Sequence, residues 1–192
     1  MVATSKITPI RRRFMLTIAS FVVFSFACAA YIISDVILSH VEQELQRDIL
    51  DRSKLIAARA TPFIEDDQRS ELKQALQSLK NLGNFNYVHI YNYKTPDELE
   101  FFNSYNRAGY LAIASKVEQI NQFPAPHISG NIIEWVEPIK ADEVLIGHAY
   151  VQLDVSSYYQ LKRKVYISTA ISFVLILFLS FALAASLHRR VL

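Results

Sequence analysis

Two long apolar segments bracket a polar stretch in this chain. They cover residues 14–34 and 165–187, and neither contains a charged side chain. At about 1.5 Å of rise per residue, a helix of either length reaches the hydrocarbon thickness of a bilayer, which is about 30 Å. A helix also satisfies its own backbone hydrogen bonds in lipid. The pattern therefore predicts two transmembrane helices, over 14–38 and 165–187.

Helical periodicity continues directly out of the first apolar segment. The apolar positions of this stripe, three or four residues apart, are Leu38, Val41, Leu45 and Ile49. Charged and polar residues lie between them, which predicts an amphipathic helix that couples the membrane segment to the domain beyond it. The stripe packs either on its own domain or along a second copy of the chain. Pro62 is expected to end or kink this helix near Ala60, because proline lacks the amide proton.

The rest of the polar stretch predicts a mixture of helices and strands. Apolar spacing predicts helices that start at Asp66 or Asp67 and run to about residue 82, and that cover 110–122. Ser156 or Ser157 is expected to cap a last helix that runs into the second apolar segment. Period-two alternation and turn residues predict four strands, over 85–93, 98–105, 131–139 and 144–153. Paired hairpins with helices segregated to one side indicate an α+β fold with an antiparallel sheet and flanking helices.

Aromatic residues alternate along the first predicted strand. The side chains that this alternation puts on one face are Phe85, Tyr87, His89, Tyr91 and Tyr93, with Val88 and Ile90 on the other. The strip either packs as core or at a dimer contact, or it lines a pocket, since tyrosines with a few polar groups suit a small ligand. The candidate ligand-binding residues are Tyr87, His89, Tyr91, Arg107, Trp135 and His148. Arg107 is suited to an anionic ligand.

The flanking charges predict the topology. Basic residues precede the first apolar segment in 1–13 and follow the second in 188–192, and neither flank contains an acidic residue. Both termini are therefore expected in the cytoplasm and residues 39–164 outside it. A basic cluster before an apolar core also fits a cleaved signal peptide, with Ala27-Cys28-Ala29 as the cleavage site, but the apolar run continues beyond that site, which favours a membrane span. Cys28 is the only cysteine, so no intrachain disulfide can form.

Motifs for catalysis and metal binding are missing from the sequence. It has no G-x-S-x-G or P-loop pattern, no paired cysteines, no H-x-x-x-H spacing and only four glycines. We therefore expect no catalytic residue, no metal site and no cofactor in this chain. The net charge of +2 comes with no basic stripe on the central domain, so nothing indicates a nucleic-acid partner.

The order of these elements resembles the extracytoplasmic PAS-like sensor domains of two-span bacterial receptors. In particular, it looks like the CHASE8-like and small Cache-like inputs that precede HAMP and GGDEF or EAL modules. The segments that carry the resemblance are residues 53–82, 87–92, 145–151 and 153–157. Two features depart from the family pattern: Asn92 stands where an acidic residue is common, and the turn after it lacks the usual glycine.

The resemblance implies a homodimeric receptor in the bacterial inner membrane. Its domain over 39–164 would detect a periplasmic small molecule or partner protein, and helix shifts would transmit the signal to a cytoplasmic output, a cyclic-di-GMP synthesis or degradation module. Residues 188–192 look like the start of a HAMP-like linker, although no output motif is present to name a diguanylate cyclase or phosphodiesterase in a longer parent protein. Two alternatives stay open: the input of a sensor histidine kinase or chemoreceptor, and a complete small two-span accessory or partner-binding membrane protein.

Overall fold

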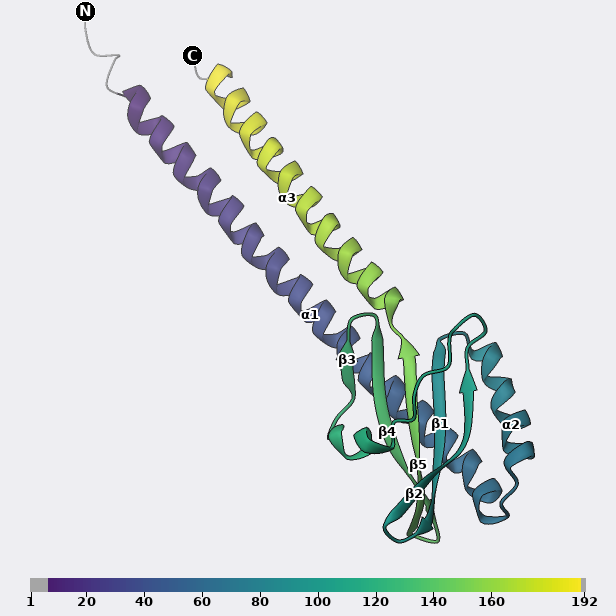
Figure 1. The fold of residues 1–192 in the computed structure, drawn as a ribbon. Helices are drawn as coiled ribbons and strands as arrows, with labels where there is room; N and C mark the ends of the chain where they lie inside the picture. Colours follow the sequence, from purple (N-terminus) through teal and green to yellow (C-terminus); the bar gives the residue numbers. More distant parts are fainter. Residues whose placement is uncertain (1–6, 191–192) are drawn as a thin grey trace, which may run out of the picture. The chain divides into compact units, whose positions relative to one another are not determined.

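The computed structural model describes residues 7–190, and it describes side chains in that range except at 7–16, 19, 119, 121–122 and 183–190. The predicted flanks 1–13 and 188–192 thus fall partly on residues 1–6 and 191–192, outside the described residues. The elements, with η for a 3-10 helix, are α1 (Ile7–Glu65), α2 (Arg69–Gln77), η1 (Ser78–Leu82), β1 (Phe85–Thr95), β2 (Glu98–Asn106), η2 (Val117–Gln122), β3 (His127–Ser129), β4 (Ile132–Ala141), β5 (Val144–Asp154) and α3 (Ser156–Arg190). The chain is α+β, as the sequence predicted (Figure 1).

The chain divides into two compact units. Of the described residues, 7–40 and 160–190 belong to one unit, and 41–159 belong to the other. Two described helical segments are long and apolar enough to cross a membrane, Ser20–Glu65 within α1 and Ser156–Ala182 within α3. Apolar side chains in them, such as Phe21 and Phe178, are about 70% exposed to the surroundings. The two long apolar helices that the sequence predicted are therefore present.

The second unit is built on a five-stranded sheet with the order β2-β1-β5-β4-β3. Every neighbouring pair of its strands is antiparallel. β5 lies at the centre, between β1 and β4, so the last strand of the chain joins the two hairpins. The sequence predicted only four strands. It missed β3 because three residues are too short to show a period of two; they pair with the start of β4, where Ile128 lies opposite Ile133.

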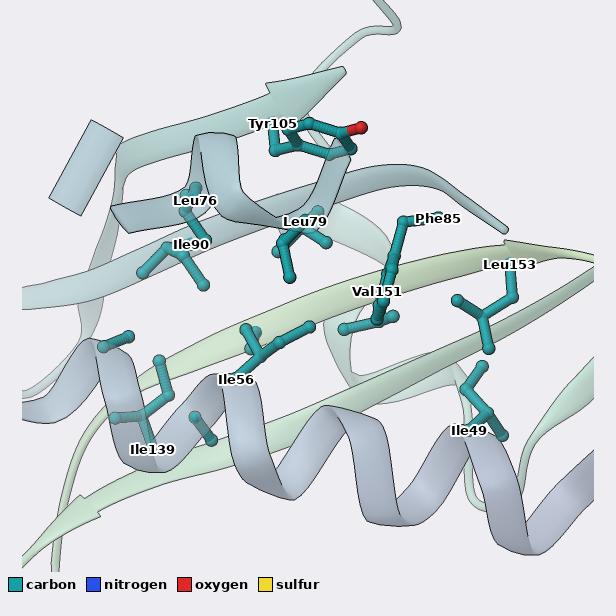
Figure 2. Close-up of a cluster of buried hydrophobic side chains, with 14 of the residues drawn as sticks. Ile49, Ile56, Leu76, Leu79, Phe85, Ile90, Tyr105, Ile139, Val151 and Leu153 are labelled. Atoms are coloured by element: carbon teal, nitrogen blue, oxygen red, sulfur yellow. The ribbon is translucent and has the colours of Figure 1, made fainter. Parts of the chain in front are cut away.

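One face of this sheet carries the main hydrophobic core. Ile56 and Ala60 of α1 and Leu72 and Leu76 of α2 pack on it, together with Val88, Ile90, Val151 and Leu153 of the strands. Figure 2 shows Ile49 of α1 and Leu153 of β5 pointing toward one another. Helices cover this face because their apolar stripes and the alternate apolar positions of β1 and β5 can be buried only against each other.

The predicted coupling stripe of α1 contacts the chain's own core. Ile49 is completely buried, and Val41 and Leu45 are half-buried against the same cluster. Leu38 is also buried, at 8% exposure. Packing on its own domain was one of the two alternatives that the sequence left open. A seam between two copies along this stripe stays a prediction.

Of the two outcomes expected at Pro62, an end of the first helix near Ala60 is wrong, and a kink stays a prediction. Pro62 lies inside α1, which continues to Glu65. A proline removes one helical hydrogen bond, and the helix around it is held by packing of Ala60 and Ile64 on the core. The helix ends where Asp67 adopts a left-handed conformation with φ of +49°.

The predicted helix caps also differ from the observed ones. α2 begins at Arg69 after Gln68, which makes no side-chain cap, so neither Asp66 nor Asp67 caps it. At α3 the cap is Asp154 in place of Ser156 or Ser157, because the carboxylate of Asp154 accepts the N–H of Ser156 at 2.8 Å. A carboxylate at a helix start also interacts favourably with the helix dipole.

The predicted helix over 110–122 is wrong except for η2, which covers Val117–Gln122. Residues 110–116 cross the sheet without regular structure. Their backbone groups are bound by tyrosine side chains: the hydroxyl of Tyr87 donates to the carbonyl of Leu111, and the hydroxyl of Tyr91 accepts the N–H of Lys116, both at 2.7 Å. The N–H of Lys116 therefore has an acceptor on the sheet in place of a helical carbonyl.

Candidate functional site: the aromatic face of the sheet

The face of the sheet opposite α1 and α2 carries most of the predicted aromatic strip. Tyr87, His89 and Tyr91 of β1 lie beside Tyr150 of β5. The ring of His89 lies 5.8 to 6.4 Å, centroid to centroid, from the rings of Tyr87, Tyr91, Tyr150 and Phe101. Period-two alternation on neighbouring strands brings these rings together, so His89 is enclosed by aromatic side chains.

Phe85 does not belong to this face, although simple alternation predicted it there. The pairing of β1 with β5 shifts register between Phe85 and Tyr87. A register shift of this kind inserts an extra residue and turns the preceding side chain to the other face. Phe85 is therefore part of the core beneath the helices, with Val88 and Ile90.

The segment between β2 and β3 covers the aromatic face. Besides the hydrogen bonds from Tyr87 and Tyr91, Ile120 is buried against this face, and Ile113, Val117 and Phe123 pack at its margin. Tyr91 and Tyr150 are fully buried as a result. The face is a packed second core in this conformation, and a ligand would reach it only if residues 110–123 moved.

A buried polar cluster lies on the β4 and β5 side of this face. One carboxylate oxygen of Glu134, Oε1, accepts the hydroxyl of Tyr150 at 3.2 Å and the side-chain amide of Gln152 at 3.1 Å. The amide of Gln152 also donates to the Tyr150 hydroxyl at 3.0 Å. Burial, and next the charge of Glu134, raise the pKa of Tyr150 well above its ordinary value. Tyr150 is therefore a neutral hydrogen-bond donor at physiological pH.

His89 is held in its neutral form. Burial, and next the positive charge of Lys116, lower its pKa to about 4. Its Nδ1 lies 3.1 Å from the Tyr91 hydroxyl, which already accepts the N–H of Lys116 and so can donate its own proton to Nδ1. The amine of Lys116 lies 5.7 Å from the centre of the Tyr150 ring. His89, Tyr91 and Lys116 thus link the sheet to the covering segment.

His148 shares this face at its far end. It lies opposite Tyr91 in the pairing of β5 with β1, and its ring contacts that of Tyr93 at 5.7 Å. It is 9% exposed, and burial lowers its pKa. Its Nδ1 is buried without a hydrogen-bond partner among the described residues.

The structure separates the six predicted ligand-binding residues into three places. Tyr87, His89, Tyr91 and His148 share the aromatic face. Trp135 packs instead against the core under the helices, and its indole N–H donates to Glu137 at 2.7 Å. Arg107 lies beyond the end of β2, and its Nη1 is 3.5 Å from the carboxylate of Asp154. Neither Trp135 nor Arg107 has a described contact with His89.

Three residues with polar groups on this face were not among the sequence candidates: Glu134, Tyr150 and Gln152. Alternation within the strand predicted over 144–153 does place His148, Tyr150 and Gln152 on one side. Which face of the sheet that side joins depends on the pairing of β5 with β1 and β4, which is not encoded locally. Among the described residues, no group of three His, Cys, Asp or Glu side chains could hold a metal ion.

No protein-family model matches the chain, and no curated protein matches it.

Proposed function

We propose that this chain is the input half of a bacterial transmembrane signalling receptor. Residues 39–164 form its PAS-like sensor domain on the periplasmic side, and its two apolar helices lie in the inner membrane with both termini in the cytoplasm. The output is a cyclic-di-GMP synthesis or degradation module. An antiparallel sheet with helices on one face and a covered aromatic face on the other supports the resemblance to sensor domains.

The observation that carries this proposal is the continuity between the sheet and the apolar helices. α1 packs on the sheet through Ile49 and Ile56 and is one uninterrupted helix with the first apolar segment. β5, the central strand, is separated from α3 by Val155 alone. In the proposed receptor, a shift of α1 or β5 is passed to the apolar helices along the chain itself, as one of the known kinds of switching transition.

In the proposed receptor, the aromatic face has two arrangements: the closed one described above and an open one that a ligand favours. A ligand that enters between His89 and the covering segment competes with the hydrogen bond between Tyr91 and the N–H of Lys116. The ligand shifts the equilibrium only in so far as it binds the open arrangement more tightly than the closed one. Opening also changes the surroundings of Tyr150, which lies on the strand that leads into α3.

The topology is tested first. Alkaline phosphatase, which is active only outside the cytoplasm, is fused within the loop at Gly130 and, separately, after Leu192. Activity of the Gly130 fusion alone agrees with the proposal. Activity of the Leu192 fusion, or of neither, contradicts the proposed orientation.

The signalling role is tested by joining the full chain, at Leu192, to a HAMP helix and a diguanylate cyclase domain. Cyclic-di-GMP is measured in cells at matched protein levels. We expect Tyr91→Phe to change the cyclic-di-GMP level, because it removes the hydroxyl that holds the covering segment. Lys73→Ala, at an exposed position of α2, is the control that should leave the level unchanged. Equal output from both variants and the parent contradicts the proposal.

A further inference from the structure

A second polar site lies outside the aromatic face, at the end of β1 and β2 nearest η1. It is a pocket of about 260 Å³. The residues that line it are Lys80, Gly83, Phe85, Tyr105, Arg107 and Ala108. Phe85 and Tyr105 belong to the core beneath the helices, so this pocket is separate from the site around His89. Its size suits a small metabolite or inorganic ion, below the range of typical drug-sized ligands.

The lining of this pocket is positively charged. Lys80 and Arg107 are the charged residues that line it, and no acidic side chain does. Phe85 and Tyr105 are almost completely buried and provide rigid aromatic walls. Figure 2 shows the hydroxyl of Tyr105 directed away from the aliphatic side chains of the core. Two cations and a phenol on rigid walls favour an oxyanion.

Arg107 makes two long side-chain contacts in this structure, with Asp154 and with the ring of Tyr110, whose centre lies 5.6 Å from the guanidinium carbon. Its Nη1 lies 3.5 Å from the carboxylate of Asp154, longer than the roughly 2.7–2.9 Å of a strong charge-assisted hydrogen bond. Both side chains are partly exposed, at 37% and 25%. The backbone is fixed, since the N–H of Arg107 donates to the carbonyl of Asn86 at 2.9 Å. The guanidinium can therefore change partners without movement of the chain that carries it.

The partner of Arg107 is the last residue of β5, two positions before the start of α3. Asp154 caps this helix through Ser156, and its own N–H donates to the carbonyl of Asn84 at 2.8 Å. The side chain of Asn84 accepts a hydrogen bond from Arg52 of α1 at 3.0 Å. Asn84 and Asp154 thus join the pocket to α1 and to the first turn of α3.

We propose that this pocket binds a small oxyanion, a carboxylate or a phosphate, between Lys80 and Arg107, and that Arg107 exchanges Asp154 for the anion when it binds. The exchange alters the charge beside the first turn of α3. The signalling consequence rests on the proposed function, whereas the binding itself does not.

The experiment measures binding of inorganic phosphate and of succinate to the full chain in phosphatidylcholine nanodiscs, by isothermal titration calorimetry. We expect Arg107→Ala to weaken binding by about ten- to a hundredfold, since a hydrogen bond to a charged group contributes about 1.5–3 kcal/mol. Lys80→Ala should weaken it by about tenfold or less. The matched control, Lys73→Ala, changes an exposed lysine of α2 outside the pocket and should leave the affinity unchanged.

Asp154→Asn tests whether Arg107 exchanges Asp154 for the anion or has only a structural role. Asparagine keeps the side-chain oxygen that caps α3 but removes the charge that competes for Arg107. The proposed exchange predicts severalfold tighter anion binding by this variant. Affinity that stays equal or falls, in a variant with the same far-ultraviolet circular dichroism as the parent, overturns the exchange.

The source of the oxyanion is distinguished by a second set of nanodiscs that contain phosphatidylglycerol. Weaker apparent binding of free phosphate in these discs identifies a lipid headgroup as competitor, and unchanged binding identifies a soluble ligand; both support an oxyanion site. Absence of phosphate and succinate binding in both kinds of disc overturns the site, even if the cyclase fusion responds to Tyr91→Phe. If phosphate or succinate binds but Tyr91→Phe does not change the cyclic-di-GMP level of the cyclase fusion, the proposed function is contradicted and the oxyanion site still stands.

Discussion

The Nδ1 atom of His89 lies 3.1 Å from the hydroxyl of Tyr91, two residues further along β1 and on the same face of the sheet. Both side chains are buried. Through the N–H of Lys116, the same hydroxyl holds the segment that covers the face. This pair is therefore where the rigid sheet meets the one large irregular segment of the domain.

Tyr91→Phe tests that connection as a change in stability. The substitution keeps the ring but removes the hydroxyl that contacts the N–H of Lys116 and Nδ1 of His89, so we expect a loss of about 1–3 kcal/mol in the free energy of unfolding. Urea titration of the full chain in detergent, followed by fluorescence of Trp135, the only tryptophan, measures it. Tyr93→Phe is the control, since Tyr93 is half-buried and its hydroxyl has no hydrogen bond among the described residues. Equal effects of both substitutions would contradict the assigned role of Tyr91.

His89 should make the domain less stable in acid. Its pKa is about 4 in the folded chain and about 6.5 when unfolded, so between these values the unfolded chain binds more protons. The contribution of His89 to the free energy of unfolding is therefore fully present above about pH 6.5. It is lost as the pH falls toward 4, by up to about 1.4 kcal/mol per pH unit. Burial of His148 acts in the same direction.

His89→Phe should flatten that dependence between pH 7 and pH 5. Urea titrations across this range measure the slope in the parent and the variant. His127→Gln changes an exposed histidine and serves as the control. A slope that His89→Phe leaves unaltered would show that His89 is accessible to protons in the folded chain.

Gly147→Ala should be severely destabilising. Gly147 is buried in β5 opposite Asn92 of β1, and a Cβ there would overlap the backbone carbonyl oxygen of Tyr91. We expect a loss of about 3 kcal/mol or more, because neither backbone can move without breaking the central strand pair. Gly130→Ala, where φ is +55° but the space is open, should cost only about 1–2 kcal/mol. Thermal unfolding of the two variants measures their losses of stability. A larger loss for Gly130→Ala than for Gly147→Ala would contradict the close approach of β1 and β5.

A disulfide should form between the apolar helices. The hydroxyls of Ser34 in α1 and Thr169 in α3 lie 3.0 Å apart within the first unit. Ser34→Cys with Thr169→Cys, made in a chain with Cys28→Ser, should therefore cross-link within one chain under copper phenanthroline and migrate faster on a non-reducing gel. Ser34→Cys with Ile171→Cys is the matched control, since Ile171 is exposed on α3. Equal cross-linking of both pairs, or cross-linking between chains only, would contradict the observed pairing.

Local pattern was sufficient for much of the fold. The apolar helices, the α+β class and the strands over 85–93, 98–105, 131–139 and 144–153 were predicted from the sequence, with ends that differ by a few residues. Period-two alternation also grouped Tyr87, His89 and Tyr91 correctly. These features repeat over several residues and depend on the burial of one face, which the order of apolar and polar positions expresses directly.

The candidate site was less predictable. The residues that meet at the aromatic face come from β1, β4, β5 and the covering segment, which are far apart in the sequence. Tyr150 and Glu134 join the face only because β5 pairs between β1 and β4. Strand order and register depend on long-range pairing, so no local pattern predicts them.

By itself, then, the sequence determined the two apolar helices, the mixed fold and the alternation of the aromatic strip, because each follows from the spacing of side chains along one segment. Only the tertiary structure decided that residues 110–116 are not helical, since tyrosines of a distant strand bind their backbone groups. It also decided that Phe85 turns to the helical core and that Arg107 pairs with Asp154 at the start of α3. These features depend on contacts between segments that are remote in sequence. The free energies of those contacts exceed the local conformational preferences of the residues involved.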